Sequence, residues 1–342
     1  MNRELAPAVR VAPAKLNLTL AVIGRRSDGF HSLHSVMVPL GLADRLSVAV
    51  LPRGTDTLHV SGFEAGPNPA NLVLRAVAAA RSAVGRSDPT PPLAIRLDKR
   101  IPVAAGLAGG SSDAAAALDA SLEAWGATLD PVTLMATAAA IGSDVPFFLA
   151  GGPALVEGRG ERVTPLHGLH AASPAPWVLL VTPAVPVSTA AVFAAWSAGA
   201  MGEPGVVRRT SEHFASEFGS GISRSAFLER AGVLAAANDL LPAAAAVMPE
   251  LIPIRRRLMR LLGRPVGLSG SGPTLWTLYA AEGDATSAAD RVRDAVADGS
   301  FPAPGGAPFI EATPLAIPPP AVVDPADGPD FPDRPLMEAR PT

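Results

Sequence analysis

The 342-residue sequence contains no cysteine. This absence excludes disulfides and thiolate metal sites, and it is typical of a reducing compartment, so we expect a cytoplasmic location. The sequence also lacks a large excess of either charge, because its formal net charge is -3. A chain without a basic surplus offers no electrostatic case for binding nucleic acid or an acidic membrane surface. We therefore expect neither among its partners.

Lysine is almost absent as well. Of the 28 basic residues only Lys15 and Lys99 are lysines, and the remaining 26 are arginines. An ammonium is a compact point charge that a planar guanidinium does not replace. Because the chain otherwise uses arginine, the lysine at position 15 indicates a site that requires an ammonium group.

One uncharged run, residues 176–202, is long enough to span a bilayer. Pro183 and Pro186 interrupt it, and residues 177–181 have the pattern of a buried strand that precedes a helix of small residues. We therefore expect no membrane span.

The length of the chain and the composition of its end indicate two domains and a tail. Residues 314–342 contain nine prolines and no periodic pattern, which predicts a disordered tail. The other 313 residues suffice for two domains. We place the domains at 1–155 and 156–313, because the pattern changes to strand, strand, helix beyond residue 152.

Apolar alternation predicts one long strand over residues 10–23 and two strands within 36–51, separated around Gly41 and Asp44. Residues 199–225 show many glycines and serines without a clear period. This composition predicts a mobile loop or short helices.

The most informative stretch is 101–118, where a loop rich in proline and glycine leads into an alanine-rich helix. Its glycines allow positive φ and close backbone approach, and its two serines are expected to begin the helix. The free N–H groups and dipole of a helix start suit a phosphate; a flexible loop before a core helix is the alternative. The pattern is neither a Walker loop nor the dinucleotide fingerprint. The residues concerned are Pro102, Val103, Ala104, Ala105, Gly106, Leu107, Ala108, Gly109, Gly110, Ser111 and Ser112.

Two pairs of residues in the first 31 positions could serve a ligand. Lys15 and Asn17 are two apart in an expected strand, so both side chains face the same side and can reach one cleft. An ordinary solvated face is the alternative. Phe30 and His31 follow a turn and could hold a base or a sugar, or could simply form a connection with a satisfied histidine.

Asp144 is the only charged residue between Asp130 and Glu157. A carboxylate among apolar residues needs a partner, because an unpaired charge in an apolar setting is costly. A helix N-cap is the alternative role for this residue. Further along, residues 267–274 form a Gly-Ser-Gly segment that is explained either as a tight turn or as backbone that contacts a ligand.

Three separated motifs, at 13–18, 102–115 and 268–274, resemble in sequence and order the signatures of the GHMP kinases, a family of small-molecule kinases. The resemblance covers residues 10–313. It implies a two-domain α+β fold, in which the N-terminal domain is similar to domain 2 of ribosomal protein S5 and the C-terminal domain is an α/β sandwich. It also implies ATP and Mg²⁺ as cofactors, a small-molecule substrate in a cleft between the domains, and a monomer or homodimer.

Two further stretches, 25–31 and 142–146, resemble the members of this family that phosphorylate a cytidylyl-linked erythritol in the non-mevalonate route to isoprenoid precursors. Two alternatives stay open. One is another GHMP kinase, of homoserine or mevalonate type, and the other is a nucleotide-binding module that has lost catalysis.

The resemblance also assigns roles to residues. It makes Asp144 the general base that takes the proton of the acceptor hydroxyl, and Lys15 its cationic neighbour. ATP is expected at Asn71 and at residues 102–112. On the substrate side the resemblance implies Asn17, Phe30, His31, Thr189, Phe193, Ser269, Gly270, Ser271 and Gly272.

The sequence departs from the family at four of these positions. Phe30 stands where tyrosine is common, which keeps stacking but removes a phenolic hydrogen bond. Ala104, Ala105 and Ala108 replace glycines found in many relatives, so the closest approach to phosphate is expected at the glycines that remain. No cluster of acidic residues in the sequence identifies the magnesium ligands. The remaining loop glycines are Gly106, Gly109 and Gly110.

Overall fold

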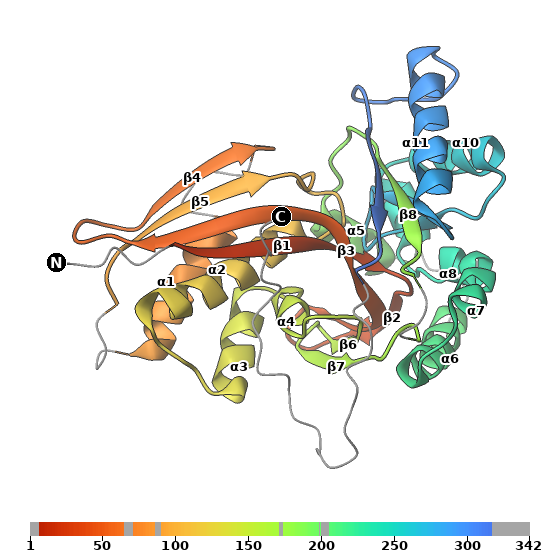
Figure 1. Cartoon of the computed structure of the whole chain (residues 1–342). Coiled ribbons are helices and arrows are strands. Elements are labelled where there is room, and N and C mark those ends of the chain that lie inside the picture. Colours follow the sequence, from red (N-terminus) through yellow and green to blue (C-terminus); the bar gives the residue numbers. More distant parts are fainter. Residues whose placement is uncertain are drawn as a thin grey trace.

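The computed structural model describes residues 7–64, 71–85, 90–170, 174–197, 199 and 205–316. These residues form two β-sheets with helices packed against them (Figure 1). The first sheet comes from the first half of the chain and the second from the other half. The expected α+β class is therefore confirmed.

The first sheet has seven strands within the described residues, in the order β4-β5-β3-β6-β7, and β1 and β2 also pair with β3. Only β4 and β5 run parallel. Because β6 and β7 belong to this sheet, it continues past the boundary expected at residue 155, and we propose that the first domain ends after Pro165. The strands are β1 (Ala8–Asn17), β2 (Ala21–Arg25), β3 (His31–Val50), β4 (Thr57–Gly62), β5 (Leu93–Lys99), β6 (Ala154–Gly158) and β7 (Arg162–Pro165).

The long strand β3 runs unbroken for 20 residues, so the expectation of two strands here was wrong. Gly41 serves close packing rather than a turn, because a Cβ on it would lie 2.8 Å from Cγ of Pro314. Asp44 is fully buried, and its carboxylate accepts hydrogen bonds from the backbone N–H groups of Arg100 (2.5 Å) and Ile101 (2.8 Å). Both residues that suggested a turn therefore make tertiary contacts, which a local pattern does not reveal.

The chain leaves the sheet between β1 and β2, so the single strand expected over 10–23 was also wrong. The N–H of Leu20 donates to the carbonyl of Ala237 at 2.7 Å, and its own carbonyl accepts from the N–H of Asp239 at 2.9 Å. The N–H of Val22 then donates to the Asp239 carboxylate at 2.9 Å. Backbone groups of residues 20–22 thus bond to the second half of the chain. The apolar alternation alone had predicted that these residues continue a strand.

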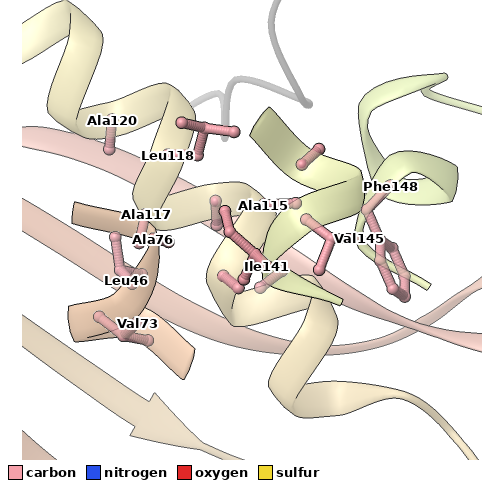
Figure 2. Packing of buried hydrophobic residues seen from close by; sticks show 14 of the residues in the cluster. Leu46, Val73, Ala76, Ala115, Ala117, Leu118, Ala120, Ile141, Val145 and Phe148 are labelled. Atoms are coloured by element: carbon pink, nitrogen blue, oxygen red, sulfur yellow. The ribbon is translucent and has the colours of Figure 1, made fainter. Parts of the chain in front are cut away.

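Four helices cover one face of the first sheet (Figure 1). Residues 114–117 of α2 are four fully buried alanines, whose small side chains allow the helix to lie close to β1 and β3. Figure 2 shows Ala115 and Ala117 in the cluster of buried apolar residues that also contains Leu46, Val73 and Phe148. This packing fixes the N-terminus of α2, where the expected anion site lies. The helices are α1 (Leu72–Val84), α2 (Gly109–Trp125), α3 (Pro131–Ile141) and α4 (Val145–Leu149).

The second sheet has the order β11-β8-β10-β9 within the described residues. Its apolar residues share a core with four helices of the second half of the chain. The strands are β8 (Trp177–Thr182), β9 (Gly267–Leu268), β10 (Leu275–Tyr279) and β11 (Phe309–Pro314), and the helices are α5 (Thr189–Ser197), α9 (Leu241–Val247), α10 (Leu251–Leu262) and α11 (Glu282–Ala297).

Three further helices, α6 (Val206–Ser220), α7 (Arg224–Glu229) and α8 (Ala231–Ala236), precede α9. A helix of 15 residues therefore replaces the loop or short helices expected over 199–225, of which residues 200–204 lie outside the described part. Three buried phenylalanine rings hold α6 and α7 together. They are Phe214, Phe218 and Phe227.

The first three residues of the segment expected to be a tail, 314–316, are ordered in the structure. Pro314 is the last residue of β11, and Leu315 is 1% exposed and donates its N–H to the carbonyl of Pro176 at 2.9 Å. The N–H of Ala316 donates to the carbonyl of Pro39, also at 2.9 Å. Residues 314–316 are thus part of the folded chain, and residues 317–342 lie outside the described residues.

Within the residues that the structure describes, no helix is both long enough and apolar enough to cross a membrane. The uncharged run at 176–202 contributes β8 and α5 instead.

Candidate active site

A cavity of about 520 Å³ is lined by residues from both halves of the chain. This volume is in the range of small-molecule sites, roughly 300–1,000 Å³. Its lining residues are Lys15, Asn17, Leu20, Leu33, Met37, Asn71, Leu72, Lys99, Pro102, Val103, Ala104, Ala105, Gly106, Ala108, Gly109, Gly110, Ser111, Asp113, Asp144, Thr189, Phe193, Leu240, Gly270 and Ser271. The structure thus brings most of the expected site residues together. Those that do not line the cavity are Phe30, His31, Leu107, Ser112, Ser269 and Gly272.

The glycine loop between β5 and α2 crosses the Gly-Ser-Gly segment at close range. Gly106 has a φ of 77°, and a Cβ on it would lie 2.4 Å from the carbonyl oxygen of Ser269. Only glycine fits this crossing. Ala104 and Ala108 also have left-handed backbones, with φ of 55° and 54°. Two of the three alanines that depart from the family therefore occupy positions where glycine is the relaxed choice.

Helix α2 begins at Gly109, two residues before the serines that were expected to start it. The N–H groups of Ser111 and Ser112 both donate to the carbonyl of Ala108 at 3.0 Å. The N–H groups of Gly109 and Gly110, in the first turn, have no partner within a helix and lie at the cavity wall. These two amides and the Ser111 hydroxyl are the groups through which the helix start can bind an anion.

Ser112 has a different place from its neighbour. It is 1% exposed, and its hydroxyl oxygen has no hydrogen-bond partner among the described residues. Ser112 therefore lies beneath the loop rather than at the cavity.

Lys15 is buried at the cavity wall, on β1. Its Nζ donates to Oδ1 of Asn17 at 2.6 Å and to the carbonyl of Gly106 at 2.8 Å. Asn17 in turn donates from Nδ2 to Oγ of Ser35 at 2.8 Å. Burial lowers the pKa of the Lys15 ammonium, and the nearby Asp144 carboxylate partly offsets this effect. The lysine is thus held by neutral acceptors, with one carboxylate near its third proton.

Asp144 stands just before α4, and its carboxylate makes no capping hydrogen bond to that helix. Its Oδ2 lies 3.8 Å from Nζ of Lys15, and the side chain is 30% exposed. A carboxylate that faces a cavity beside an ammonium can accept a proton from a bound hydroxyl, whereas a capping carboxylate would already be engaged. The geometry therefore argues against the alternative in which the Asp144 side chain caps a helix.

The Gly-Ser-Gly segment touches both Lys15 and the glycine loop. Ser269 donates its hydroxyl to the carbonyl of Gly106 at 3.0 Å, and a Cβ on Gly270 would lie 3.2 Å from Nζ of Lys15. Ser271 and Thr189 share a hydrogen bond of 2.9 Å between their hydroxyls. The segment is therefore a wall of the site and more than a connecting turn.

Asn238 holds this segment in place and was not among the expected site residues. Its Nδ2 donates to the carbonyls of Leu268 and Gly270, both at 2.9 Å. Its Oδ1 accepts from the N–H of Leu240, which opens α9. The only signal in the sequence was a polar residue that interrupts a helical pattern.

The aromatic residues expected at the site lie at different places. Phe193 lines the cavity, and its ring stacks on His31. The ring of His31 also makes an edge contact with Trp196. Its Nε2 forms a hydrogen bond of 2.8 Å with Oγ of Ser197. Phe30 is 48% exposed beneath the guanidinium of Arg159, away from the cavity.

Asn71 has a structural role as well as a place at the cavity. Its Oδ1 accepts the N–H of Val73 at 2.9 Å and caps α1.

Comparison with known proteins gives the site a family context. Residues 71–152 match the N-terminal domain of the GHMP kinases, and residues 213–298 match the C-terminal domain. The chain is 38% identical over 284 residues to 4-diphosphocytidyl-2-C-methyl-D-erythritol kinase of Moorella thermoacetica, across 83% of this chain and 94% of the relative. It is 40% identical over 284 residues to the kinase of the same name from Paramagnetospirillum magneticum, across 81% and 91%.

Solved structures show the same fold. A crystal structure of 4-(cytidine 5'-diphospho)-2C-methyl-D-erythritol kinase matches with a TM-score of 0.63 at 34% identity, over 90% of this chain and 99% of the other. Homoserine kinase from Cytophaga hutchinsonii matches with a TM-score of 0.63 over 92% and 96%, at 13% identity. At that identity the likeness shows the fold alone.

Proposed function

Since this chain belongs to the 4-diphosphocytidyl-2-C-methyl-D-erythritol kinases, a branch of the GHMP kinases, we propose that it phosphorylates the 2-hydroxyl of 4-diphosphocytidyl-2-C-methyl-D-erythritol. The chain is an ATP-dependent kinase of isoprenoid precursor synthesis, and its fold is the two-domain GHMP kinase fold. The observation that supports roles for particular residues is the 3.8 Å distance between Oδ2 of Asp144 and Nζ of Lys15 at the cavity.

Asp144 is the proposed general base. The acceptor oxygen attacks the γ-phosphorus of ATP, a new O–P bond forms, and the bond from γ-phosphorus to the bridging oxygen breaks to release ADP. The hydroxyl proton passes to the Asp144 carboxylate. In phosphoryl transfer most of the acceleration comes from positioning and charge stabilisation, so a weak base is sufficient.

Lys15 supplies the positive charge beside this base. Its ammonium attracts the Asp144 carboxylate and offsets negative charge that grows on the transferring phosphoryl group. Two of its protons are held by Asn17 and Gly106, so the side chain has a fixed direction. Such preorganisation means that the charge need not be reoriented during the reaction.

The glycine loop and the start of α2 are the proposed phosphate site for ATP. The amides of Gly109 and Gly110 and the hydroxyl of Ser111 line the cavity. Backbone N–H groups at a helix N-terminus bind phosphate through hydrogen bonds and the helix dipole together. Asn71 and Leu72 line the same cavity at the start of α1 and are proposed to face the adenine side.

Magnesium is expected to arrive with ATP, because Mg²⁺ in kinases is held largely by phosphate oxygens and water. Within the described residues no group of three or more histidine, aspartate or glutamate side chains forms a separate metal site. The cavity does offer oxygen donors, the Asp144 carboxylate and the Ser111 hydroxyl, which fit this hard cation. When bound, magnesium neutralises charge on the phosphates.

The acceptor's cytidine is proposed to bind on the side of α5. Phe193 lines the cavity there with Thr189, and His31 stacks on Phe193. An aromatic ring offers a nucleobase a stacking surface. Phe30 is exposed and does not line the cavity, so its proposed role in binding cytidine has less support than that of Phe193.

The test is ATP consumption by the purified protein with magnesium and each of three acceptors: 4-diphosphocytidyl-2-C-methyl-D-erythritol, homoserine and mevalonate. We expect turnover with the first only, and ³¹P and ¹³C NMR of the product should locate the new phosphate on the 2-hydroxyl. Turnover with homoserine or mevalonate instead would replace the proposed acceptor. ATP binding without turnover on any acceptor would favour a binding module that has lost catalysis.

A further inference from the structure

The second lysine of the chain lies beside the glycine loop and has no part in the proposed reaction. Nζ of Lys99 donates to Oδ2 of Asp113 at 2.7 Å and also contacts Oδ2 of Asp44. The three side chains are 3%, 4% and 0% exposed. Burying three ionisable side chains together costs free energy that well-packed apolar residues would not, so stability alone is a poor reason for such a cluster.

The cluster joins the two ends of the glycine loop. Lys99 is the last residue of β5, immediately before the loop, and Asp113 lies in α2, immediately after it. Asp44, on β3, accepts the N–H groups of Arg100 and Ile101, so it also ties the entrance of the loop to the sheet. One ammonium thus connects the strand before the loop, the helix after it and the central strand.

Packing transmits the position of the cluster to the anion-binding amides. Gly109, the first residue of α2, has no space for a side chain: a Cβ would lie 2.9 Å from Cγ2 of Ile101 and 3.2 Å from Nζ of Lys99. Lys99, Gly109 and Asp113 all line the cavity. A shift of the Lys99–Asp113 pair would therefore move Gly109, whose N–H belongs to the proposed phosphate site.

We infer that Lys99 and Asp113, anchored by Asp44, form a clip that holds the glycine loop in its phosphate-binding shape before the nucleotide arrives. These are positioning residues, which act through the backbone of the loop. A loop that is already ordered loses less conformational entropy when a ligand binds. The clip therefore raises the affinity for ATP without contacting the acceptor. The identity of the ligand as ATP rests on the proposed function, whereas the order of the loop does not.

The test compares two substitutions on one helix. Asp113→Asn removes the carboxyl group that accepts the hydrogen bond of Lys99, with little change of volume. Asp119→Asn is the matched control, because Asp119 also lies on α2 and pairs with a buried cation, Arg10, but far along the helix from the loop. Hydrogen–deuterium exchange of peptides that cover residues 100–112 measures loop order, and steady-state kinetics measure KM for ATP, KM for the acceptor and kcat.

We expect Asp113→Asn to raise exchange in the loop peptides and to raise KM for ATP about tenfold, with kcat and the acceptor KM within about twofold of wild type. Asp119→Asn should leave loop exchange and the KM for ATP unchanged. Equal effects of the two substitutions, or unchanged loop exchange in Asp113→Asn, would overturn the clip.

A second substitution covers the case in which Asp113→Asn does not fold. Lys99→Arg keeps the charge but replaces the compact ammonium by a larger planar group beside Gly109, so it should also raise loop exchange and the KM for ATP. Wild-type loop exchange in Lys99→Arg would contradict the inference. If the wild-type protein transfers no phosphate but the loop responds to these substitutions, the proposed function fails and the clip stands.

Discussion

The imidazole of His31 stacks on the ring of Phe193, with ring centroids 4.9 Å apart and 21° between the planes. The contact joins the first residue of β3 to α5, so this stacked pair connects the two halves of the chain. Phe193 lines the cavity and His31 does not, which makes Phe193 the ring that a ligand reaches.

Replacement of Phe193 should therefore weaken binding of the cytidylyl acceptor. Phe193→Leu keeps apolar volume but removes stacking, which is worth roughly 1–3 kcal/mol per base, so we expect the acceptor KM to rise about tenfold or more. The KM for ATP should not change. Phe30→Leu is the control and should alter the acceptor KM less than threefold; a larger effect of Phe30→Leu than of Phe193→Leu would reverse the proposed assignment.

The base hypothesis predicts a separation of binding from turnover at Asp144. Asp144→Asn keeps the size of the side chain but cannot accept the proton, and general-base catalysis contributes about 10²–10⁴-fold. We expect kcat to fall by at least 100-fold while the ATP dissociation constant stays within about threefold, measured by calorimetry. Near-normal kcat in this variant would remove Asp144 as the base.

The clip also predicts a pH dependence of stability. Burial, together with the nearby Asp44, raises the pKa of Asp113 from 3.8 to about 8, although Lys99 opposes the shift. Between these values the folded protein binds a proton that the unfolded chain has released, so the free energy of unfolding should fall as pH rises through about 8. Urea unfolding at pH 6 and pH 9 measures the change. Asp113→Asn should show a smaller loss across this interval, and an equal loss would contradict the assignment.

The left-handed alanines predict that glycine is tolerated in the loop. Ala108 precedes α2 with φ of 54°, a conformation that costs alanine roughly 1 kcal/mol. Ala108→Gly relieves this strain but adds freedom to the unfolded chain, so we expect unchanged stability or a gain of up to about 1 kcal/mol. Ala108→Val should destabilise by at least 1 kcal/mol. Thermal unfolding of the two variants provides the comparison, and greater stability of the valine variant would be inconsistent with this backbone.

The end of β11 predicts a sharp difference between two truncations. A chain that ends at Ala316 keeps the buried Leu315 and its hydrogen bond to Pro176, whereas a chain that ends at Thr313 loses both. Burial of one leucine side chain contributes about 1.5–3 kcal/mol, so the shorter chain should be less stable by about that amount. Urea unfolding of the pair tests this, and equal midpoints would mean that residues 314–316 contribute nothing.

Much of the fold could be predicted because its elements carry local signals. Asp130 accepts the N–H groups of Val132 and Thr133 and caps α3 as its position before a proline indicates, and Gly126 ends α2. The errors fell where a distant segment decides the local structure. Gly41 looked like a turn because Pro314, which explains it, is far away in the sequence.

The same limit applies to the cavity. Lys15, Asp144 and the glycine loop could be placed together because each belongs to a motif whose order along the chain is typical of a family. Lys99 and Asn238 could not, because their partners are distant carboxylates and carbonyls that no spacing predicts. The rarity of lysine was a signal for position 99 as much as for position 15.

The glycine loop is hydrogen-bonded both to a strand far before it in the sequence and to a segment far after it. The carbonyl of Leu107 accepts the N–H of Lys15 at 3.0 Å, and the carbonyl of Ala105 accepts the N–H of Thr274 at 3.3 Å. During synthesis the ribosome must therefore add more than 160 residues after the loop before its last bond can close. Contacts of such long sequence separation form late in folding. A nascent chain, or one released early, would thus carry the nucleotide motif without the finished nucleotide site.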